Sequence, residues 1–249
     1  MTDVATEEEG AAPLPAEGAA KRTFVRGMFS AIAPRYDLLN HLLSLNVDRL
    51  WRRRALRELR WERAPAGTYV DLCAGTLDVA AALARQPGFL GRILGADFAE
   101  PMLRAGRDKV SKSIVTPVVA DALELPLKNG AADGAIVAFG IRNVSDLDAS
   151  LREVHRVLAR GARFVILEFT TPRQRLVRAL YHAYFHRLLP LIGGLVSGNR
   201  AAYRYLPASV AHFPAEAELG ARMRAAGFAD VTWTSLTLGI AAIHVGAKR

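Results

Sequence analysis

A short turn of small residues between a predicted strand and a predicted helix carries the clearest chemical signal in the sequence. The stretch YVDLCAGTLDVAA begins with the apolar residues Tyr69 and Val70 and turns through Gly75 and Thr76. From Leu77 its apolar residues recur at helical spacing. A strand, a tight turn and a helix form the first crossover of a doubly wound α/β sheet, where ligands bind beyond the strand ends. Small side chains let a ligand approach the backbone, and the helix N-terminus offers unpaired N–H groups.

An acidic residue follows this turn at the spacing that ribose recognition requires. Asp97 closes a second predicted strand, and an acid about twenty residues after the turn can accept hydrogen bonds from both ribose hydroxyls. The dinucleotide fingerprint and the P-loop are both absent, because Gly75 is the only glycine between Asp71 and Gly88 and no Gly-Lys-Ser/Thr follows. A nucleoside without a phosphate-binding turn indicates S-adenosylmethionine (SAM). The alternative is that Asp97 only caps a helix that begins near Glu100.

The rest of the sequence predicts the sheet that would position these residues. Helices between the strands are expected near residues 77–85, 100–110 and 146–158, and a further helix near 216–226. This alternation predicts a mainly parallel sheet, and the last two strands, only a few residues apart, should form an antiparallel hairpin. The fold class is therefore α/β, with the Rossmann-like seven-stranded sheet of class I methyltransferases. The strands are expected near residues 68–72, 92–96, 115–119, 134–139, 163–168, 230–236 and 241–246.

Helices are also expected before the sheet. Residues 1–20 are rich in Ala, Glu, Gly and Pro and are predicted to be a disordered tail. Residues 21–249 are predicted to form one domain, whose N-terminal helices occupy residues 21–60. The first helix should start at Lys21 and end before Pro34, and a second helical piece should cover residues 36–45. Asp48 is expected to cap a third helix from Arg49 to Leu59. This helix carries Trp51 beside a run of arginines, which suits either an anionic lipid surface or, as we weigh higher, core packing of Trp51.

A helical insertion is expected between the fifth strand and the last helix, over residues 170–215. Its apolar residues recur in pairs four apart and include three aromatics. This stripe would either cover the active-site mouth and receive a greasy substrate, or simply pack into the core. His182 and His186 share the other side of the helix, but the Glu of a zinc motif and nearby cysteines are missing, so no metal site is expected.

Composition restricts the class of protein and its partners. The 249 residues are 51% hydrophobic, which is enough for one sizeable core, and the net charge of +9 favours acidic partners such as anionic lipid or nucleic acid. Nucleic acid ranks low, because the basic residues are scattered through amphipathic helices without a stacking platform. The single cysteine, Cys73, fits a reducing compartment and is interpreted as a small packing residue because no base accompanies it in sequence. No segment has the length of a membrane span and no signal peptide is recognisable, so a cytoplasmic protein is expected, with peripheral contact at the inner membrane face left open. A homodimer is compatible with the sequence, which leaves the oligomeric state undecided.

Several stretches resemble the ubiquinone/menaquinone biosynthesis C-methyltransferases. The resemblance covers the chain from about Phe24 to the C-terminus, and the residues that carry it are MFSAIAPRYDLLNHLLSLNVDRLWRR (28–53), FGIRNVSDLDASLREVHRVL (139–158), YRYLPASVAHFP (203–214) and LTLGIAAIHVGAK (236–248). It implies methyl transfer from SAM to a ring carbon of a polyprenylated quinol, either a demethylmenaquinol or a polyprenyl methoxybenzoquinol. A generic methyltransferase would share the sheet pattern but not these segments.

The resemblance also implies which residues hold the cofactor. Thr76 lies in the turn and Asp97 on the ribose, while Asp121 and Ala122 lie where the adenine is held. Three residues depart from the family pattern: Leu77 stands where a second glycine is usual, Ala74 where a glycine is common, and Ala138 where the family has a serine. Leu77 would crowd the methionine moiety unless its side chain points between helix and sheet. The full set expected around the cofactor is Asp71, Gly75, Thr76, Asp97, Phe98, Met102, Asp121, Ala122 and Ala138.

Methyl transfer to a ring carbon needs positioning and a group that favours the phenolate. Arg142, in FGIRN after the fourth strand, is a permanent cation and a good phenolate stabiliser, and Asn143 would orient the ring or the cofactor. Tyr36 and Asp37 would close the pocket, with Asp37 a candidate for moving the proton through water. The alternatives are an Arg142–Asp146 surface ion pair and a plain helix start at Tyr36–Asp37.

His244 matches the family but is expected to be a packed core histidine. Two other functions stay open at this point. The first is methylation of another hydrophobic small molecule, such as a sterol or a polyketide. The second is a non-catalytic scaffold subunit in a quinone-synthesis complex, with Leu77 as the mark of lost catalysis.

Overall fold

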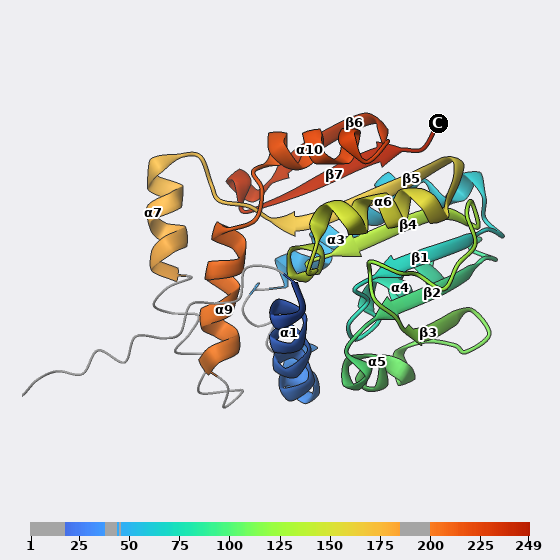
Figure 1. Cartoon of the computed structure of the whole chain (residues 1–249), viewed down its shortest axis with the longest axis horizontal. Coiled ribbons are helices and arrows are strands. Elements are labelled where there is room, and N and C mark those ends of the chain that lie inside the picture. Colours follow the sequence, from blue (N-terminus) through green and yellow to red (C-terminus); the bar gives the residue numbers. More distant parts are fainter. Residues whose placement is uncertain (1–17, 38–43, 45, 185–199) are drawn as a thin grey trace, which may run out of the picture.

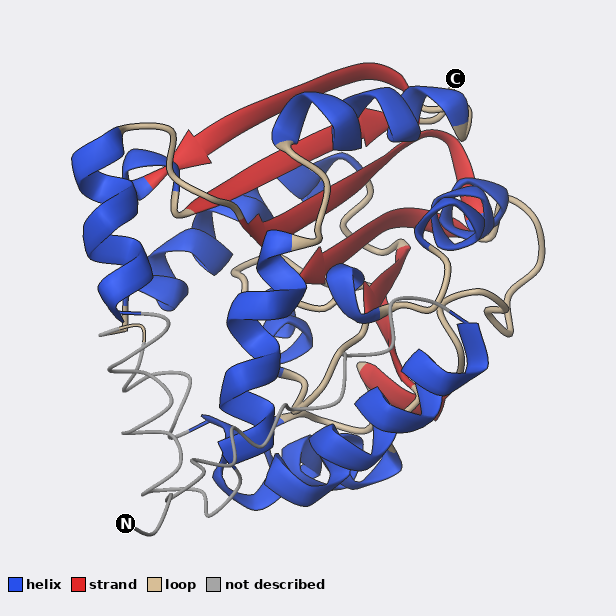
Figure 2. Cartoon of the chain, turned by 60° about the vertical axis from the view of Figure 1, so that its left-hand side comes forward, coloured by secondary structure: helices blue, strands red, loops and turns tan. Residues whose placement is uncertain are grey.

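The computed structural model describes residues 18–37, 44, 46–184 and 200–249, without the side chains of residues 35, 182 and 200–204. Within this part of the chain, a seven-stranded sheet lies at the centre with helices on both faces (Figures 1 and 2). The strands are β1 (Thr68–Leu72), β2 (Arg92–Asp97), β3 (Val115–Val119), β4 (Ala132–Ala138), β5 (Leu158–Phe169), β6 (Ala229–Leu236) and β7 (Ala241–Ala247).

The strand order β3-β2-β1-β4-β5-β7-β6 confirms the predicted α/β class. Strands β3 to β5 in that order run parallel, and β7 pairs antiparallel with both β5 and β6. Strand β5 is much longer than predicted and starts at Leu158, because Leu158 pairs with Ala132 ahead of a register shift. Leu72 of β1 lies opposite Ala96 on one side and Val137 on the other. The chain order therefore reverses at β1, which places a crevice beyond the carboxyl ends of β1, β2 and β4.

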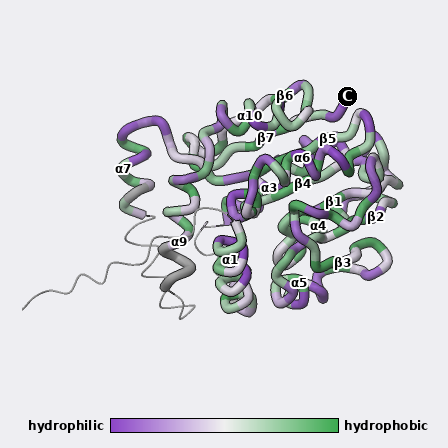
Figure 3. The backbone as a smooth tube through the Cα atoms, in the orientation of Figure 1, coloured by the Kyte–Doolittle hydropathy of each residue, from purple (hydrophilic) through white to green (hydrophobic). Residues whose placement is uncertain are grey.

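The two faces of the sheet are covered by different helices. On β1, Tyr69 packs with α3 and α4 on one face, while Val70 and Leu72 pack with α6 and α10 on the other. This alternation follows from the period of two in a strand, and strands that are buried on both faces contain many hydrophobic residues. Figure 3 shows the hydropathy of each residue along the backbone. The helices around the sheet are α3 (Val47–Leu59), α4 (Asp78–Ala84), α5 (Glu100–Gly106), α6 (Leu147–Val157) and α10 (Glu216–Ala225), with the 3-10 turns η2 (Trp61–Arg63), η3 (Arg107–Lys109), η4 (Ile141–Asn143) and η6 (Thr237–Gly239).

The N-terminal helices differ from expectation at their starts. Helix α1 (Gly18–Ile32) begins before the predicted Lys21 and continues into η1 (Ala33–Arg35). The cap expected from Asp48 is wrong: α3 begins at Val47 after a left-handed Asn46, and the Asp48 carboxylate instead accepts a 2.6 Å hydrogen bond from Ser44. Most of the predicted second helical piece and residues 1–17 of the tail lie outside the described residues.

Trp51 belongs to the core, which was the interpretation weighed higher. Its ring is buried between α3 and the sheet, and its Nε1 donates to Thr237 Oγ1 at 2.9 Å. The edge of the indole thus joins the start of α3 to η6, at the carboxyl-end edge of the sheet.

The insertion contributes helices α7 (Arg175–Ala183) and α9 (Arg200–Ala211), which stand with α1 beyond the carboxyl ends of the strands (Figure 1). The apolar stripe divides: Tyr181 is buried with Val25 and Tyr205, whereas Leu176 and Leu180 are exposed. Tyr181 therefore packs as the core alternative expects, while the leucines face outward, and none of the described α7 residues lines the cavity described below. Its continuation through residues 185–189, including His186, lies outside the described residues. None of the described helices is long and apolar enough to cross a membrane.

Candidate functional site

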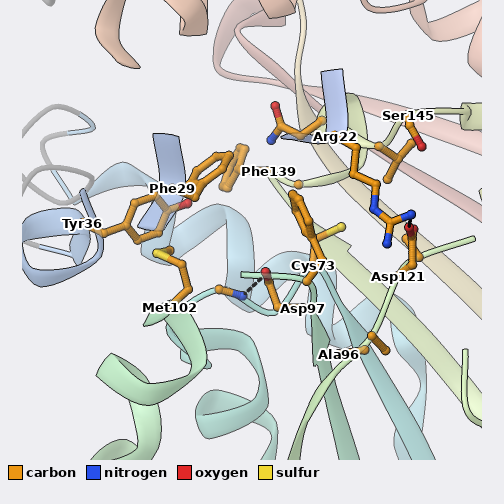
Figure 4. A pocket seen from close by; sticks show the side chains of 17 residues that line it. Arg22, Phe29, Tyr36, Cys73, Ala96, Asp97, Met102, Asp121, Phe139 and Ser145 are labelled. Atoms are coloured by element: carbon orange, nitrogen blue, oxygen red, sulfur yellow. Dashed lines mark hydrogen bonds and ion pairs between the residues drawn. The ribbon is translucent and has the colours of Figure 1, made fainter. Parts of the chain in front are cut away.

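A cavity lies beyond the ends of β1, β2 and β4, and the N-terminal cover, residues 18–37, closes over it (Figure 4). One end is polar, with Asp121 and Arg22, and Asp97 lies between this end and Met102. The other end is walled by the side chains of Phe29, Tyr36 and Met102, which come from the cover and from α5. Eight of the predicted site residues line this cavity: Tyr36, Gly75, Asp97, Phe98, Met102, Asp121, Ala122 and Asn143.

The Asp97 carboxylate is held in a fixed orientation by the backbone. Oδ2 accepts from the Gly75 N–H at 2.8 Å and Oδ1 accepts from the Ala99 N–H at 2.8 Å. Burial raises the pKa of Asp97, and the backbone N–H groups of Ala99, Gly75 and Phe98 oppose that shift. Helix α5 has Ala99, not Asp97, at its N-cap position, so the capping alternative is wrong. Each carboxylate oxygen keeps a lone pair for a further donor, as two ribose hydroxyls would supply.

The turn between β1 and α4 presents its backbone at Gly75 to the cavity. Gly75 has a positive φ of 51°, and a Cβ there would lie 3.4 Å from Met102 and 3.9 Å from the Tyr36 ring. Leu77 points the other way: it is fully buried between α4 and the sheet, where a Cβ on Gly95 would come within 2.6 Å of Leu77 Cδ2. The departure at position 77 therefore leaves the cavity open.

At the polar end, Asp121 is already partnered. Its Oδ1 accepts from the Leu123 N–H at 3.0 Å, and its Oδ2 makes a 3.0 Å ion pair with Arg22 of α1 (Figure 4). Arg22 thus reaches across the cavity from the cover. An adenine amino group at this end would have a carboxylate acceptor, with Ala122 as an apolar neighbour.

Thr76 and Asp37 form a contact just outside the cavity. Thr76 is buried, and its Oγ1 donates to Asp37 Oδ1 at 2.5 Å. Tyr36, the preceding residue, lines the cavity and packs edge-on against Phe29. Of the two residues predicted to close the pocket, Tyr36 lines the cavity, whereas Asp37 does not and instead bonds to Thr76.

Arg142 is buried in an ion pair that the sequence did not predict. Its Nη1 contacts Glu168 Oε1 at 2.7 Å and the Phe139 carbonyl at 2.6 Å, and its Nε donates to Ser209 at 3.2 Å. The surface pair with Asp146 is wrong, because Asp146 caps α6 by accepting from the Ala149 N–H. Burial raises the pKa of Glu168, and the Arg142 charge opposes that shift.

Arg142 lies beside the cavity, in a groove that also contains Tyr205 and Ser209. Asn143, the next residue, lines the cavity itself. The turn η4 therefore presents successive side chains to two neighbouring spaces.

Two further predicted residues do not reach the cavity. Asp71 is buried at the end of β1 and accepts from the Ala80 N–H at 2.9 Å, so it holds α4 to the strand. Burial raises the pKa of Asp71 to about 7. Ala138 ends β4 just before Phe139, and it is Phe139 that lines the cavity.

Sequence reasoning missed several lining residues. Arg22 and Phe29 lie on a helix whose contacts no local pattern reveals. Cys73 and Gly140 meet at the strand ends, where a Cβ on Gly140 would lie 2.4 Å from Cys73 Cβ. The close pairing of Cys73 with a glycine supports the packing interpretation of the thiol, and burial raises its pKa. His244 is a packed core histidine as expected, with Nε2 against the Glu216 carbonyl at 2.9 Å.

Among the residues whose side chains are described, no group of three or more His, Cys, Asp or Glu could hold a metal ion. His182 and His186 fall outside that set.

Comparison with known proteins places these observations in one family. The model of the ubiE/COQ5 methyltransferase family matches residues 17–248. A demethylmenaquinone methyltransferase from Thermus thermophilus is 51% identical over 224 residues, covering 89% of this chain and all of that protein. A ubiquinone/menaquinone biosynthesis C-methyltransferase from Geobacter sulfurreducens is 47% identical, covering 90% of this chain and 88% of that protein.

Solved structures agree on the fold. A SAM-dependent methyltransferase from Thermotoga maritima superimposes with a TM-score of 0.63 at 19% identity, over 90% of this chain and 99% of that one. A phosphoethanolamine N-methyltransferase from Haemonchus contortus, solved with SAM, gives a TM-score of 0.55 at 13% identity, over 74% of this chain and 49% of that one. At these identities the likeness establishes the class I methyltransferase fold alone.

Proposed function

The chain belongs to the ubiE/COQ5 methyltransferase family and is a SAM-dependent C-methyltransferase of quinone biosynthesis, and we propose that it methylates a ring carbon of a polyprenylated quinol beside the cavity described above. The observation that carries this proposal is the Asp97 carboxylate, which backbone N–H groups hold in a cavity with a polar end at Asp121 and an aromatic wall at the other end. A ribose would donate to Asp97, and the sulfonium and its acceptor would lie toward the aromatic wall.

The residues around the cavity supply binding and orientation. SAM brings a methyl group on a sulfonium, so the protein mainly holds the acceptor carbon in line with it, at about 3 Å. Asp97 would hold the ribose, Asp121 the adenine amino group, and Phe98 and Met102 the nucleoside faces. These assignments are supported by the lining of the cavity and by the family resemblance.

Activation of the acceptor requires loss of a ring hydroxyl proton. We assign phenolate stabilisation to Arg142, whose Nη2 has no hydrogen bond to any described residue and is left to meet an oxyanion. Asn143, which lines the cavity, would orient the ring or the cofactor. Because both oxygens of Asp37 are already engaged, a role in placing the cover fits it better than proton transfer.

The acceptor is a demethylmenaquinol or the equivalent benzoquinol, and the name of the Thermus relative favours the first. The test is turnover by the purified protein with methyl-labelled SAM and each quinol in detergent. Label in a menaquinol supports the proposal. A protein that turns over neither quinol would overturn it in favour of another hydrophobic acceptor or of a scaffold role. Quinones extracted from a deletion strain provide a second readout, since the demethylated quinone should accumulate.

We further propose that this protein meets its lipid-tailed substrate at an anionic membrane surface. Four exposed leucines, here called the leucine edge, belong to elements at the carboxyl-end edge of the sheet: Leu50 of α3, Leu176 and Leu180 of α7, and Leu238 of η6. Their side chains are 61–74% exposed. Trp51 of α3 bonds to Thr237 of η6, and Thr170, in the segment between β5 and α7, donates from Oγ1 to the Gly239 carbonyl of η6 at 2.7 Å.

Arginines flank this leucine edge. Arg53, Arg54 and Arg57 line a groove beside Leu50, and none of the three makes an ion pair with a described carboxylate. Apolar side chains beside unpaired arginines match the two terms of interfacial binding, burial in the acyl region and attraction to anionic head groups. The cavity lies beyond the carboxyl ends of β1, β2 and β4, at the same edge of the sheet, so docking at the leucine edge would bring a membrane-embedded quinol to the side of the molecule that carries the site.

A further inference from the structure

Lys109 ties the N-terminal cover to the turn that faces the cofactor. Its Nζ makes an ion pair with Asp37 Oδ2 and donates to Asp78 Oδ1 at 2.7 Å. Asp37 in turn accepts from Thr76 through its other oxygen. Lys109 ends η3, Asp78 begins α4, and Asp37 lies at the end of the cover, so one ammonium group joins three segments.

The contact is part of a longer row of alternating charges. Arg52 Nη1 lies 3.7 Å from Asp78 Oδ2, and Arg52 Nε lies 3.4 Å from Asp48 Oδ2. The row Asp48, Arg52, Asp78, Lys109 and Asp37, here called the charge row, runs from α3 to the cover. Its side chains are 4–33% exposed, so salt screens these pairs less than fully exposed ones.

Removal of Lys109 would leave Asp37 and Asp78 facing each other. In the described part of the chain, Lys109 is the cation that contacts both of these carboxylates, since Arg52 contacts Asp78 but not Asp37. Two like charges at such separation repel, and Asp37 is the one carried by the cover. The cover would then lose its hold on Thr76.

We propose that Lys109 is a positioning residue for SAM: it holds Asp37 on Thr76 and thereby keeps Tyr36 and Phe29 closed over the methionine end of the cavity. Lys109 itself does not line the cavity. This inference rests on the proposed function, because it takes SAM as the occupant. Its effect should fall on cofactor retention and not on the chemical step.

The first experiment compares Lys109→Met and Lys109→Arg with Lys112→Met, a matched loss of charge at an exposed neighbour outside the charge row. SAM affinity is measured by calorimetry and turnover with varied SAM. Lys109→Met should raise the Kd and KM for SAM about tenfold while kcat at saturation stays close to the parent value. Lys109→Arg should restore most of the affinity, and Lys112→Met should change nothing. The inference would be overturned if Lys109→Met and Lys112→Met lost SAM affinity equally, or if Lys109→Arg bound SAM as weakly as Lys109→Met.

A second measurement reports cover opening without SAM. Cys73 is the only cysteine in the chain and lines the cavity beneath the cover. Alkylation of Cys73 by a small thiol reagent should run several-fold faster in Lys109→Met and in Asp37→Asn than in the parent protein. The double variant should be no faster than either single variant, because both remove the same contact. If Cys73 reacts at the parent rate in folded variants, Lys109 does not hold the cover closed, whatever the ligand is. If the parent protein binds no SAM, that result refutes the proposed function alone.

Discussion

Asp97 is oriented before any ligand arrives, because two backbone N–H groups occupy one lone pair of each carboxylate oxygen. Replacement by Asn keeps the size but sets an NH2 group against one of these N–H donors. We expect Asp97→Asn to weaken SAM binding by at least about tenfold, since hydrogen bonds to charged groups contribute roughly 1.5–3 kcal/mol. Calorimetry with SAM measures this directly. Asp133→Asn, a change far from the cavity, is the control, and equal affinity of Asp97→Asn and the parent would contradict the ribose assignment.

Arg142 has a structural role that must be separated from the catalytic role proposed for it. Removing its charge alone leaves Glu168 buried without a partner, which costs roughly 3–5 kcal/mol. Arg142→Met should therefore unfold at markedly lower temperature, and Arg142→Met with Glu168→Gln should recover most of that loss. If Arg142 stabilises the phenolate, the double variant binds SAM normally and still fails to turn over quinol. Turnover by the double variant near the parent rate would remove Arg142 from the mechanism.

Leu77 shows how a residue can depart from its family without closing the site. It has a positive φ of 63° and a fully buried side chain, so backbone strain and core packing oppose each other at one position. Leu77→Ala keeps the strain and loses the packing, at a cost of about 2–5 kcal/mol. Leu77→Gly loses the packing but relieves strain of roughly 1–2 kcal/mol, so it should unfold at a higher temperature than Leu77→Ala. Both should bind SAM like the parent protein, and a gain in affinity on substitution would show that Leu77 obstructs the cofactor.

At the scale of elements, α5 approaches the cofactor turn so closely that only glycine fits between them. A Cβ on Gly106 would lie 2.2 Å from the Thr76 carbonyl oxygen, and α5 also carries Met102 into the cavity. We expect Gly106→Ala to push α5 outward, lowering stability by about 1–3 kcal/mol as overpacking does, and to weaken SAM binding as well. Thermal unfolding and calorimetry test both effects, with the exposed Ala105→Ser as control. Normal affinity in a destabilised Gly106→Ala would show that α5 does not position the cavity wall.

The sequence predicted the elements far better than their contacts. Strands and helices follow from hydrophobic period and from turn residues, which are local properties, so β1 and α4 could be placed almost to the residue. Asp97 was found because the family of folds sets its spacing from the turn. The ion-pair partners of Arg142 and Asp37 could not be predicted, because the fold brings them together from distant positions. Glu168 lies 26 positions after Arg142, and Lys109 lies 72 positions after Asp37. The same holds for Arg22, whose helix pattern shows an apolar face but not what that face covers.

At the scale of the whole molecule, a net charge of +9 does not by itself choose a partner. Our proposal of membrane docking rests on its distribution, because Arg53, Arg54 and Arg57 line a groove beside Leu50 of the leucine edge. We expect the protein to float with vesicles that contain phosphatidylglycerol and not with neutral phosphatidylcholine vesicles, and to be released by salt. Because each arginine near an anionic surface contributes about 1 kcal/mol, Arg53→Gln with Arg57→Gln should weaken vesicle binding at least tenfold.

The leucines supply the second half of this prediction, and the chain offers a matched control for them. Leu50→Ser with Leu238→Ser removes two apolar anchors from the leucine edge, whereas Leu90→Ser removes an even more exposed leucine just before β2, at the opposite edge of the sheet. Burying an exposed leucine contributes about 1.5–3 kcal/mol, so the first variant should lose vesicle binding and the second should keep it. Turnover should follow the same order with quinol in vesicles and be equal for all proteins with a short-chain quinol in solution. If Leu90→Ser is released from vesicles as readily as the double variant, the leucine edge is not the docking face, and charge alone accounts for the binding.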